Sequence, residues 1–215
     1  MKKETERQLL KIAKKHQTKT DPSHDFNHVL RVLNLAKLIG RQEKADFDIL
    51  VPAAIFHDII VYRKDDPRSK RETSESARFT EDILKNIKLY PRCKIKLVAE
   101  CIKQCSFSKG VKATTLESKI LQDADRIEAT GAISIMRTFS SGGQMNRCFY
   151  NPENPFGKSG ATKETNLDLF FNRLLVVKNQ MHTNMAKNIA ERRTYFVNHF
   201  LKQLKIELKE SGIIS

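Results

Sequence analysis

Apolar residues recur three and four positions apart along most of this 215-residue chain. That spacing places them on one face of an α-helix, whereas a half-buried β-strand requires alternation at every second residue, which few segments here show. Glycine (8) and proline (6) are scarce, which disfavours a β-sandwich with its many tight turns. The pattern therefore predicts an all-α bundle.

The apolar pattern divides the chain into segments of helical length. Segment 46–61 is apolar almost all round, which is typical of a helix buried at the centre of a bundle. Residues 21–23 (Asp-Pro-Ser) offer an N-cap for the second helix. The expected helices cover about residues 4–17, 25–40, 46–61, 72–86, 92–105, 115–139 (one long helix or two abutting ones), 167–181 and 183–209.

Residues 140–166 are rich in Gly, Pro, Asn and Ser, so we expect one long loop there. The chain length suits a single domain over residues 1–215. Its core is expected at about 20–139, with the C-terminal helices at about 167–209 packed on it.

The charge balance favours a polyanionic partner. Lys and Arg number 39 against 25 Asp and Glu, a formal net charge of +14. Nucleic acid, nucleotides, phosphorylated metabolites or an anionic membrane surface would all suit it, although a solvated basic surface gives the same count. No apolar run approaches the ~18 residues of a membrane span, and the charged start is unlike a secretory signal. We therefore expect a cytoplasmic protein with no membrane segment.

Two polar residues, His57 and Asp58, stand side by side in the most apolar segment of the chain. Burying such a pair costs several kcal/mol unless partners satisfy both groups. A divalent metal ion does so, because it takes an imidazole and a carboxylate together.

Two other apolar helices offer ligands of the same kinds. His28 lies in the segment 25–40, and Asp125 follows Asp123 in the segment 115–139. Two imidazoles and two carboxylates suit an octahedral divalent ion, Mn²⁺ first, with Mg²⁺, Fe²⁺, Co²⁺ or Ni²⁺ open and tetrahedral zinc disfavoured.

The ordered set of His28, His57-Asp58 and Asp125 resembles the HD-domain superfamily of metal-dependent phosphohydrolases. The resemblance covers roughly residues 20 to 205. It extends to one branch of small bacterial HD hydrolases, which includes nucleoside triphosphate pyrophosphohydrolases, through the stretches HDFNHVLRV, AAIFHDIIVYRKDDPRSKR, KQCSFSKG, ESKILQDADRIEATGAISIMRTF and NPF.

The resemblance implies an HD-domain-like helical bundle in which His28, His57, Asp58 and Asp125 bind the metal. Some HD proteins hold a second metal through histidines between the HD pair and the last Asp. Residues 59–124 contain no histidine here, so we expect one ion per chain.

The resemblance also implies residues around the ion. Lys64 and Arg71 match a Lys and an Arg of the branch, and Arg31 shares a helix face with His28; these three are the candidate substrate-binding residues. Asp58 and Lys64 are the candidate catalytic residues, Asp58 as a proton acceptor. Asp123 is expected to contact a ligand residue or to bond to the backbone rather than to bind the ion itself.

The implied activity is cleavage of nucleoside triphosphates to the monophosphate and pyrophosphate by a metal-activated water. A phosphomonoesterase or phosphodiesterase acting on a smaller phosphate ester is the alternative within this class. A basic nucleic-acid-binding module with a structural metal is the alternative of another class, but Trp is absent and aromatics are 7% without a basic and aromatic stripe. The expected partner is a phosphorylated small molecule, first a nucleotide, bound by a monomer or homodimer.

Overall fold

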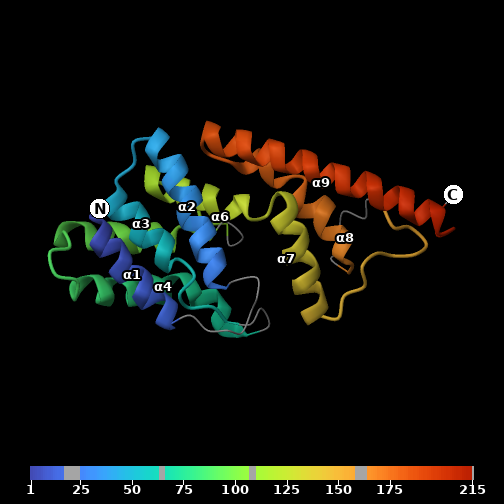
Figure 1. Cartoon of the computed structure of the whole chain (residues 1–215). Helices are drawn as coiled ribbons and strands as arrows, with labels where there is room; N and C mark the ends of the chain where they lie inside the picture. The colour runs from blue at the N-terminus through green and yellow to red at the C-terminus, as the bar shows by residue number, and fades with distance from the viewer. Residues whose placement is uncertain (17–24, 63–65, 107–109, 158–163, 215) are drawn as a thin grey trace. The chain divides into compact units, whose positions relative to one another are not determined.

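The computed structural model describes residues 1–16, 25–62, 66–106, 110–157 and 164–214. These residues form nine α-helices and contain no β-strand, which confirms the all-α prediction (Figure 1). They fall into two compact units, Met1–Asp125 and Arg126–Ser215, each of which is described by itself. The expected single domain, with C-terminal helices packed on its core, stays a prediction.

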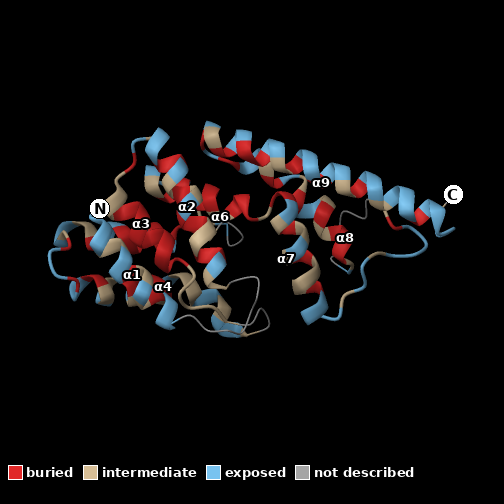
Figure 2. Cartoon of the chain, in the orientation of Figure 1, coloured by how far each residue is buried: buried red, intermediate tan, exposed pale blue. Residues whose placement is uncertain are grey.

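The first unit is built around α3, which packs against α1, α2, α4 and α5. Every residue from 49 to 56 of α3 is buried, so the helix is red along this stretch in Figure 2, whereas α1 and α2 have exposed outer faces. The apolar segment therefore does lie at the centre of the unit. Its helices are α1 (Lys3–His16), α2 (Phe26–Gln42), α3 (Phe47–Phe56), α4 (Glu72–Lys85), α5 (Ile95–Lys103) and, as far as Asp125, α6 (Leu116–Ile127), with 3₁₀ turns at Pro67–Arg71 and Arg92–Lys94.

The second unit has its own apolar core. Phe170 stacks on Phe200 with the ring centroids 5.7 Å apart, and it contacts Phe139 on α7 in a tilted arrangement with the centroids 6.0 Å apart. The buried members of this core are Leu167, Phe170, Leu174, Val197 and Leu201. The elements are α7 (Gly131–Gln144), α8 (Asn166–Leu169), a π-helical turn (Phe170–Leu174), a 3₁₀ turn (Val177–Gln180) and α9 (Asn184–Glu210).

The expected loop at 140–166 is too long at both ends. Helix α7 continues through Gly142 to Gln144, and α8 begins at Asn166. A Cβ atom at position 142 would lie 1.8 Å from Asn166 Oδ1, so this glycine allows a close contact rather than ending the helix. The described part of the connection is therefore 145–157 and 164–165.

The segment 115–139 forms two helices, α6 and α7, which is one of the two expected arrangements, and Gly131, at a φ of +73°, is the first residue of α7. Other expected boundaries differ. The segment 167–181 is a succession of short α, π and 3₁₀ turns instead of one helix. The expected N-cap at 21–23 lies outside the described residues, and Asp25 caps α2.

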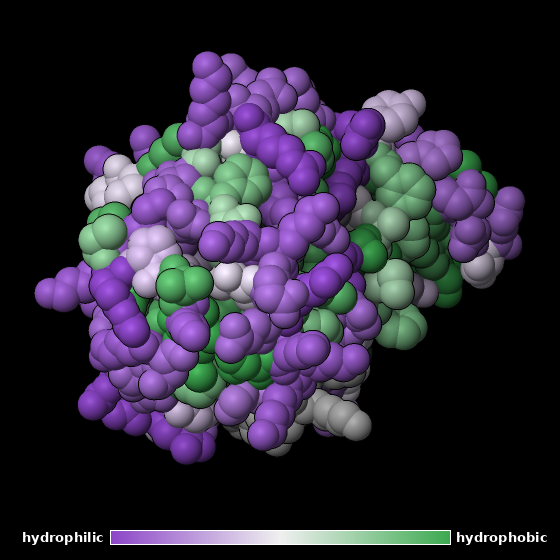
Figure 3. Space-filling view, turned by 60° about the vertical axis from the view of Figure 1, so that its left-hand side comes forward, coloured by the Kyte–Doolittle hydropathy of each residue, from purple (hydrophilic) through white to green (hydrophobic). Residues whose placement is uncertain are grey.

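Hydrophilic side chains predominate on the face drawn in Figure 3 and surround smaller groups of apolar ones. Among the described residues, no helix combines the length and the apolar character that crossing a membrane requires.

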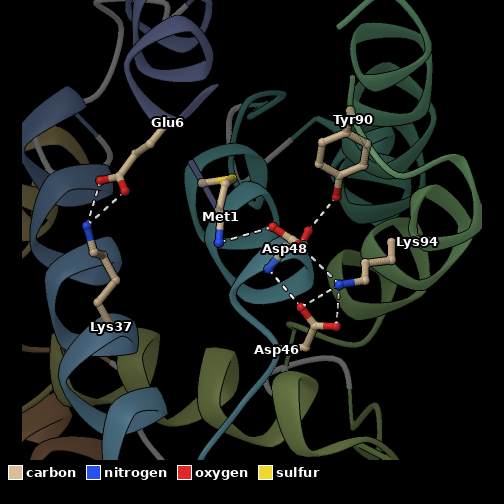
Figure 4. Close-up of polar contacts among 7 residues, drawn as sticks. All are labelled: Met1, Glu6, Lys37, Asp46, Asp48, Tyr90 and Lys94. Carbon is tan, nitrogen blue, oxygen red and sulfur yellow. Dashed lines mark hydrogen bonds and ion pairs between the residues drawn. The ribbon is translucent and has the colours of Figure 1, made fainter. Parts of the chain in front are cut away.

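A proline inside α3 leaves one backbone carbonyl without its helical donor, and a tyrosine hydroxyl supplies the missing hydrogen bond. Pro52 has no N–H, so the carbonyl of Asp48, four residues earlier, lacks its helical donor. The Tyr90 hydroxyl donates to that carbonyl (Figure 4). Lys94 Nζ lies 3.0 Å from Asp46 Oδ1 and 2.8 Å from Asp48 Oδ2. These hydrogen bonds raise the pKa of Lys94 and lower that of Asp48, and they tie the start of α3 to α5.

Replacing Tyr90 by phenylalanine is expected to lower the free energy of unfolding by about 1–2 kcal/mol, because the part-buried carbonyl of Asp48 loses that donor. Urea denaturation measures the change. Tyr195→Phe is the matched control, since Tyr195 is 76% exposed and its loss should stay within about 0.5 kcal/mol. Equal losses in the two variants would contradict the role given to Tyr90.

Side-chain contacts also hold α6 within the first unit. The backbone N–H of Asp46 donates to Glu117 Oε1 at 2.9 Å, in the first turn of α6. Buried Gln122 donates from Nε2 to the carbonyls of Gln104 and Val111, at 2.6 and 2.9 Å. Both contacts help to fix the position of α6, which carries Asp123 and Asp125 near its C-terminal end. On the other side of the unit, an ion pair between Glu6 and Lys37 at 2.6 Å joins α1 to α2 (Figure 4).

Candidate metal centre

The HD pair lies where α3 ends, not inside a helix that continues to residue 61. The last helical residue is Phe56, and His57 is the C-cap. The chain then turns, with the N–H of Ile59 donating to the carbonyl of Phe56 at 3.2 Å. The prediction that both polar residues lie within the helix is thus wrong, because His57 is the cap and Asp58 follows it in the turn.

The reason for this early end lies in α4, which offers acceptors to the segment that follows. The N–H of Ile60 donates to Ser76 Oγ at 3.2 Å, and the N–H of Tyr62 donates to Glu72 Oε1 at 2.8 Å. These amides are satisfied away from α3, so the helix has no need to continue. Ser76 is fully buried, which makes this contact part of the core.

The imidazole of His57 is fixed in one tautomer. Its Nδ1 lies 2.9 Å from the carbonyl oxygen of Ala54. Because a carbonyl only accepts, Nδ1 carries a proton, and in the neutral imidazole the lone pair is therefore on Nε2. His57 Nε2 is buried and has no hydrogen-bond partner among the described residues. A buried ring nitrogen with a lone pair, oriented by a backbone carbonyl, is the form in which histidine binds metals.

His28 is positioned by the start of α2. Asp25 is the N-cap, and its Oδ1 accepts a hydrogen bond from the backbone N–H of His28 at 2.8 Å. The imidazole of His28 is fully buried, and its centroid lies 5.4 Å from that of His57. The cap therefore fixes the helix turn that brings the two imidazoles together.

Two carboxylates approach these imidazoles. Asp58 Oδ2 lies 3.5 Å from His28 Nε2 and 3.6 Å from His57 Nε2. Asp125 Oδ1, in the last turn of α6, lies 3.7 Å from His28 Nε2. The ligand atoms of His28, His57 and Asp125 all lie within 4.8 Å of one another.

These separations match ligands arranged around one ion. Ligand atoms at about 2.1 Å from a divalent ion stand roughly 3.0 Å apart when adjacent and 4.2 Å apart when opposite. Asp58 is not in this group of three, but its short distances to both imidazoles place it at the same site. The imidazoles are buried, whereas Asp58 and Asp125 are 24% and 37% exposed, so the carboxylate side is open to solvent.

The other candidate residues have different positions. Asp123 is fully buried on α6, and Arg31 is partly exposed on α2, one turn after His28. Arg71 is 64% exposed and its Nε lies 3.4 Å from Glu75 Oε1. Lys64 lies outside the described residues. The structure thus brings the four predicted ligands together and shows Arg71 beside a carboxylate on α4.

Sequence reasoning missed residues that support the site. Asp25 stands three positions before His28, which is the spacing of an N-cap, so this one could have been found. Glu75 stands four positions after Arg71, the spacing of a helical ion pair. Ser76 had no such signal, because its partner is the backbone of a segment distant in sequence.

Replacing Asp25 by alanine is expected to lower the free energy of unfolding by about 1 kcal/mol and to weaken Mn²⁺ binding several-fold, because the cap holds the turn that carries His28. Denaturant unfolding and Mn²⁺ titration by electron paramagnetic resonance measure the two effects. Thr183→Ala is the matched control, since it removes the α9 cap to the N–H of Ala186 and should change stability alone. Equal Mn²⁺ affinity in both variants would contradict the link to His28.

Comparisons with known proteins identify relatives of this chain. The HD domain family matches residues 25–130. YpgQ of Bacillus subtilis (strain 168) is 32% identical over 197 residues, covering 88% of this chain and 87% of YpgQ. The crystal structure of YpgQ in complex with ADP has a TM-score of 0.73 at 27% identity over 95% of each chain. An HD-superfamily hydrolase from Bacillus thuringiensis has a TM-score of 0.73 at 28% identity, covering 97% of this chain and 99% of that one.

Proposed function

The chain belongs to the HD domain family of metal-dependent hydrolases, and from this premise we propose that it cleaves nucleoside triphosphates to the monophosphate and pyrophosphate. The observation that carries the proposal is the position of the buried Nε2 of His57. This atom has no hydrogen-bond partner among the described residues and lies close to Asp58 and to the imidazole of His28. Imidazoles and carboxylates this close together suit a divalent cation, which in turn can bind a phosphate substrate.

Four residues would hold the ion: His28, His57, Asp58 and Asp125, with Mn²⁺ as the first choice. When bound, the ion supplies Lewis-acid activation of the attacking water and of the phosphoryl group. The two imidazoles hold their positions through the α2 cap and the Ala54 carbonyl. Asp58, on the more exposed side, is the proposed acceptor of the proton that the water loses, and buried Asp123 supports α6 near Asp125.

A nucleotide is the proposed substrate because it supplies several negative charges next to the metal. The YpgQ structure contains ADP, which supports a nucleoside phosphate for this chain as well. Arg31, Lys64 and Arg71 are the proposed phosphate-binding cations, with Lys64 also acting on the reacting phosphate. A cytoplasmic location, where nucleotides are abundant, follows from the same proposal.

The test is a product assay over nucleoside tri-, di- and monophosphates and a phosphodiester, each with Mn²⁺ and with EDTA. We expect pyrophosphate rather than phosphate from triphosphates, only with the metal present. The His57→Ala protein, purified in parallel, measures contaminating phosphatase activity. Phosphate release from monophosphates as the main activity would overturn the triphosphate assignment and favour a phosphomonoesterase.

A further inference from the structure

Tyr62, five residues after His57, is held by three different contacts. Its N–H is bound by Glu72, as described above, and its hydroxyl donates to Glu75 Oε2 at 2.6 Å. The guanidinium carbon of Arg68 lies 4.5 Å from the centre of its ring. The hydrogen bond to Glu75 raises the pKa of the Tyr62 hydroxyl, so this group stays a donor at neutral pH.

The second oxygen of the same carboxylate faces Arg71. Glu75 Oε1 lies 3.4 Å from Arg71 Nε, one helical turn earlier, and the two side chains are 31% and 64% exposed. Glu75 therefore joins the segment after the metal centre to the arginine for which we propose phosphate binding.

The two described arginines of this region are held very differently. Arg68 donates to Asp66 from Nε at 3.1 Å and from Nη2 at 2.7 Å, and it also stacks on Tyr62. These bonds hold the pKa of Asp66 below its usual value. Arg71 has one longer contact with Glu75, so Arg71 is the arginine that can change partner at lower cost.

We propose that Glu75 positions Arg71 in the ligand-free protein and competes with the second phosphate of a nucleotide for it. This inference rests on the proposed function. An exposed ion pair at 3.4 Å is weak, whereas a phosphate offers a guanidinium two short, charge-assisted hydrogen bonds. Arg71 therefore moves to the phosphate when a nucleotide binds, and Glu75 keeps its hydrogen bond to Tyr62.

The decisive variant is Glu75→Gln, because its amide oxygen can still accept from the Tyr62 hydroxyl while the charge that retains Arg71 is gone. ADP binding to the full chain with Mn²⁺ is measured by calorimetry, with nucleotide integrity checked afterwards. We expect ADP to bind about two- to fivefold more tightly, the size of an exposed ion pair, and AMP to bind as before. A role of Glu75 in folding alone would weaken binding, so a gain in affinity is diagnostic.

Two further variants separate the explanations. Asp82→Asn removes the same charge from α4 at a residue paired with Lys85, and it should leave ADP affinity unchanged. In Arg71→Ala protein, ADP binding should be weaker, and adding Glu75→Gln should change nothing further.

The outcomes are distinguishable. Weaker ADP binding in Arg71→Ala together with unchanged binding in Glu75→Gln would overturn the competition while leaving Arg71 as a phosphate ligand. An unchanged ADP affinity in Arg71→Ala would overturn both. Equal gains in Glu75→Gln and Asp82→Asn would mean a general charge effect and would also overturn the competition.

Discussion

His57→Ala protein is expected to lose its bound divalent ion and to lose more than about a hundredfold in hydrolytic rate. Changes to residues that merely orient a ligand already cost about 10–100-fold in metal affinity or activity, and His57 is proposed as a ligand itself. Elemental analysis of the purified protein and the pyrophosphate assay measure the two losses. Unaltered protein should contain about one equivalent of metal, the amount that a single group of ligands can hold.

His199→Ala is the matched control for this experiment. His199 is exposed on α9, so its loss should leave both metal content and rate unchanged. Because His57 is buried, circular dichroism must establish that the variant is folded. A folded His57→Ala protein with its full metal content would refute the proposed ligand set.

Arg71→Ala is expected to lower kcat/KM for a nucleoside triphosphate by about ten- to a hundredfold, and to have a smaller effect on a monophosphate. A charge-assisted contact with a phosphate contributes roughly 1.5–3 kcal/mol, and only the larger substrate has phosphates beyond the reacting one. Lys64→Ala should show the same preference, with a larger effect on kcat. Steady-state kinetics on both substrates measure this.

Lys70→Ala provides the comparison, because Lys70 is an exposed cation immediately before Arg71. Its effect should be small and equal for both substrates. If Arg71→Ala behaved like Lys70→Ala while metal content was intact, Arg71 would be an ordinary surface residue.

Most helices could be predicted because the spacing of their apolar residues indicates which face is buried. The buried nature of α3 could be deduced from its composition, and α9 begins and ends within one residue of the expected range. The misplaced boundaries depend on tertiary contacts. Gly142 suggested a loop because its contact with Asn166 is absent from any local pattern, and α3 ends early because α4 supplies acceptors to the following amides.

For the candidate site, too, the residues could be predicted from the sequence but their tertiary contacts could not. The residue types, the apolar context and the family resemblance identified His28, His57, Asp58 and Asp125, which the structure brings together. The sequence could not show that His57 is oriented by a backbone carbonyl, since a carbonyl belongs to every residue. It also could not show that Arg71 rests beside Glu75, because helical spacing permits that pair without requiring it.

The proposed ligands belong to α2, the end of α3 and the end of α6, so they are separated by up to about a hundred residues along the chain. An ion that binds all of them would act on folding as a reversible cross-link that closes a very long loop, present only in the native state. At a free concentration a hundred times its dissociation constant, it would add about 2.7 kcal/mol to the stability of the unit that carries it. Metal availability would then set how long the chain survives proteolysis as well as how fast it turns over, and starvation for the ion would lower abundance and activity together.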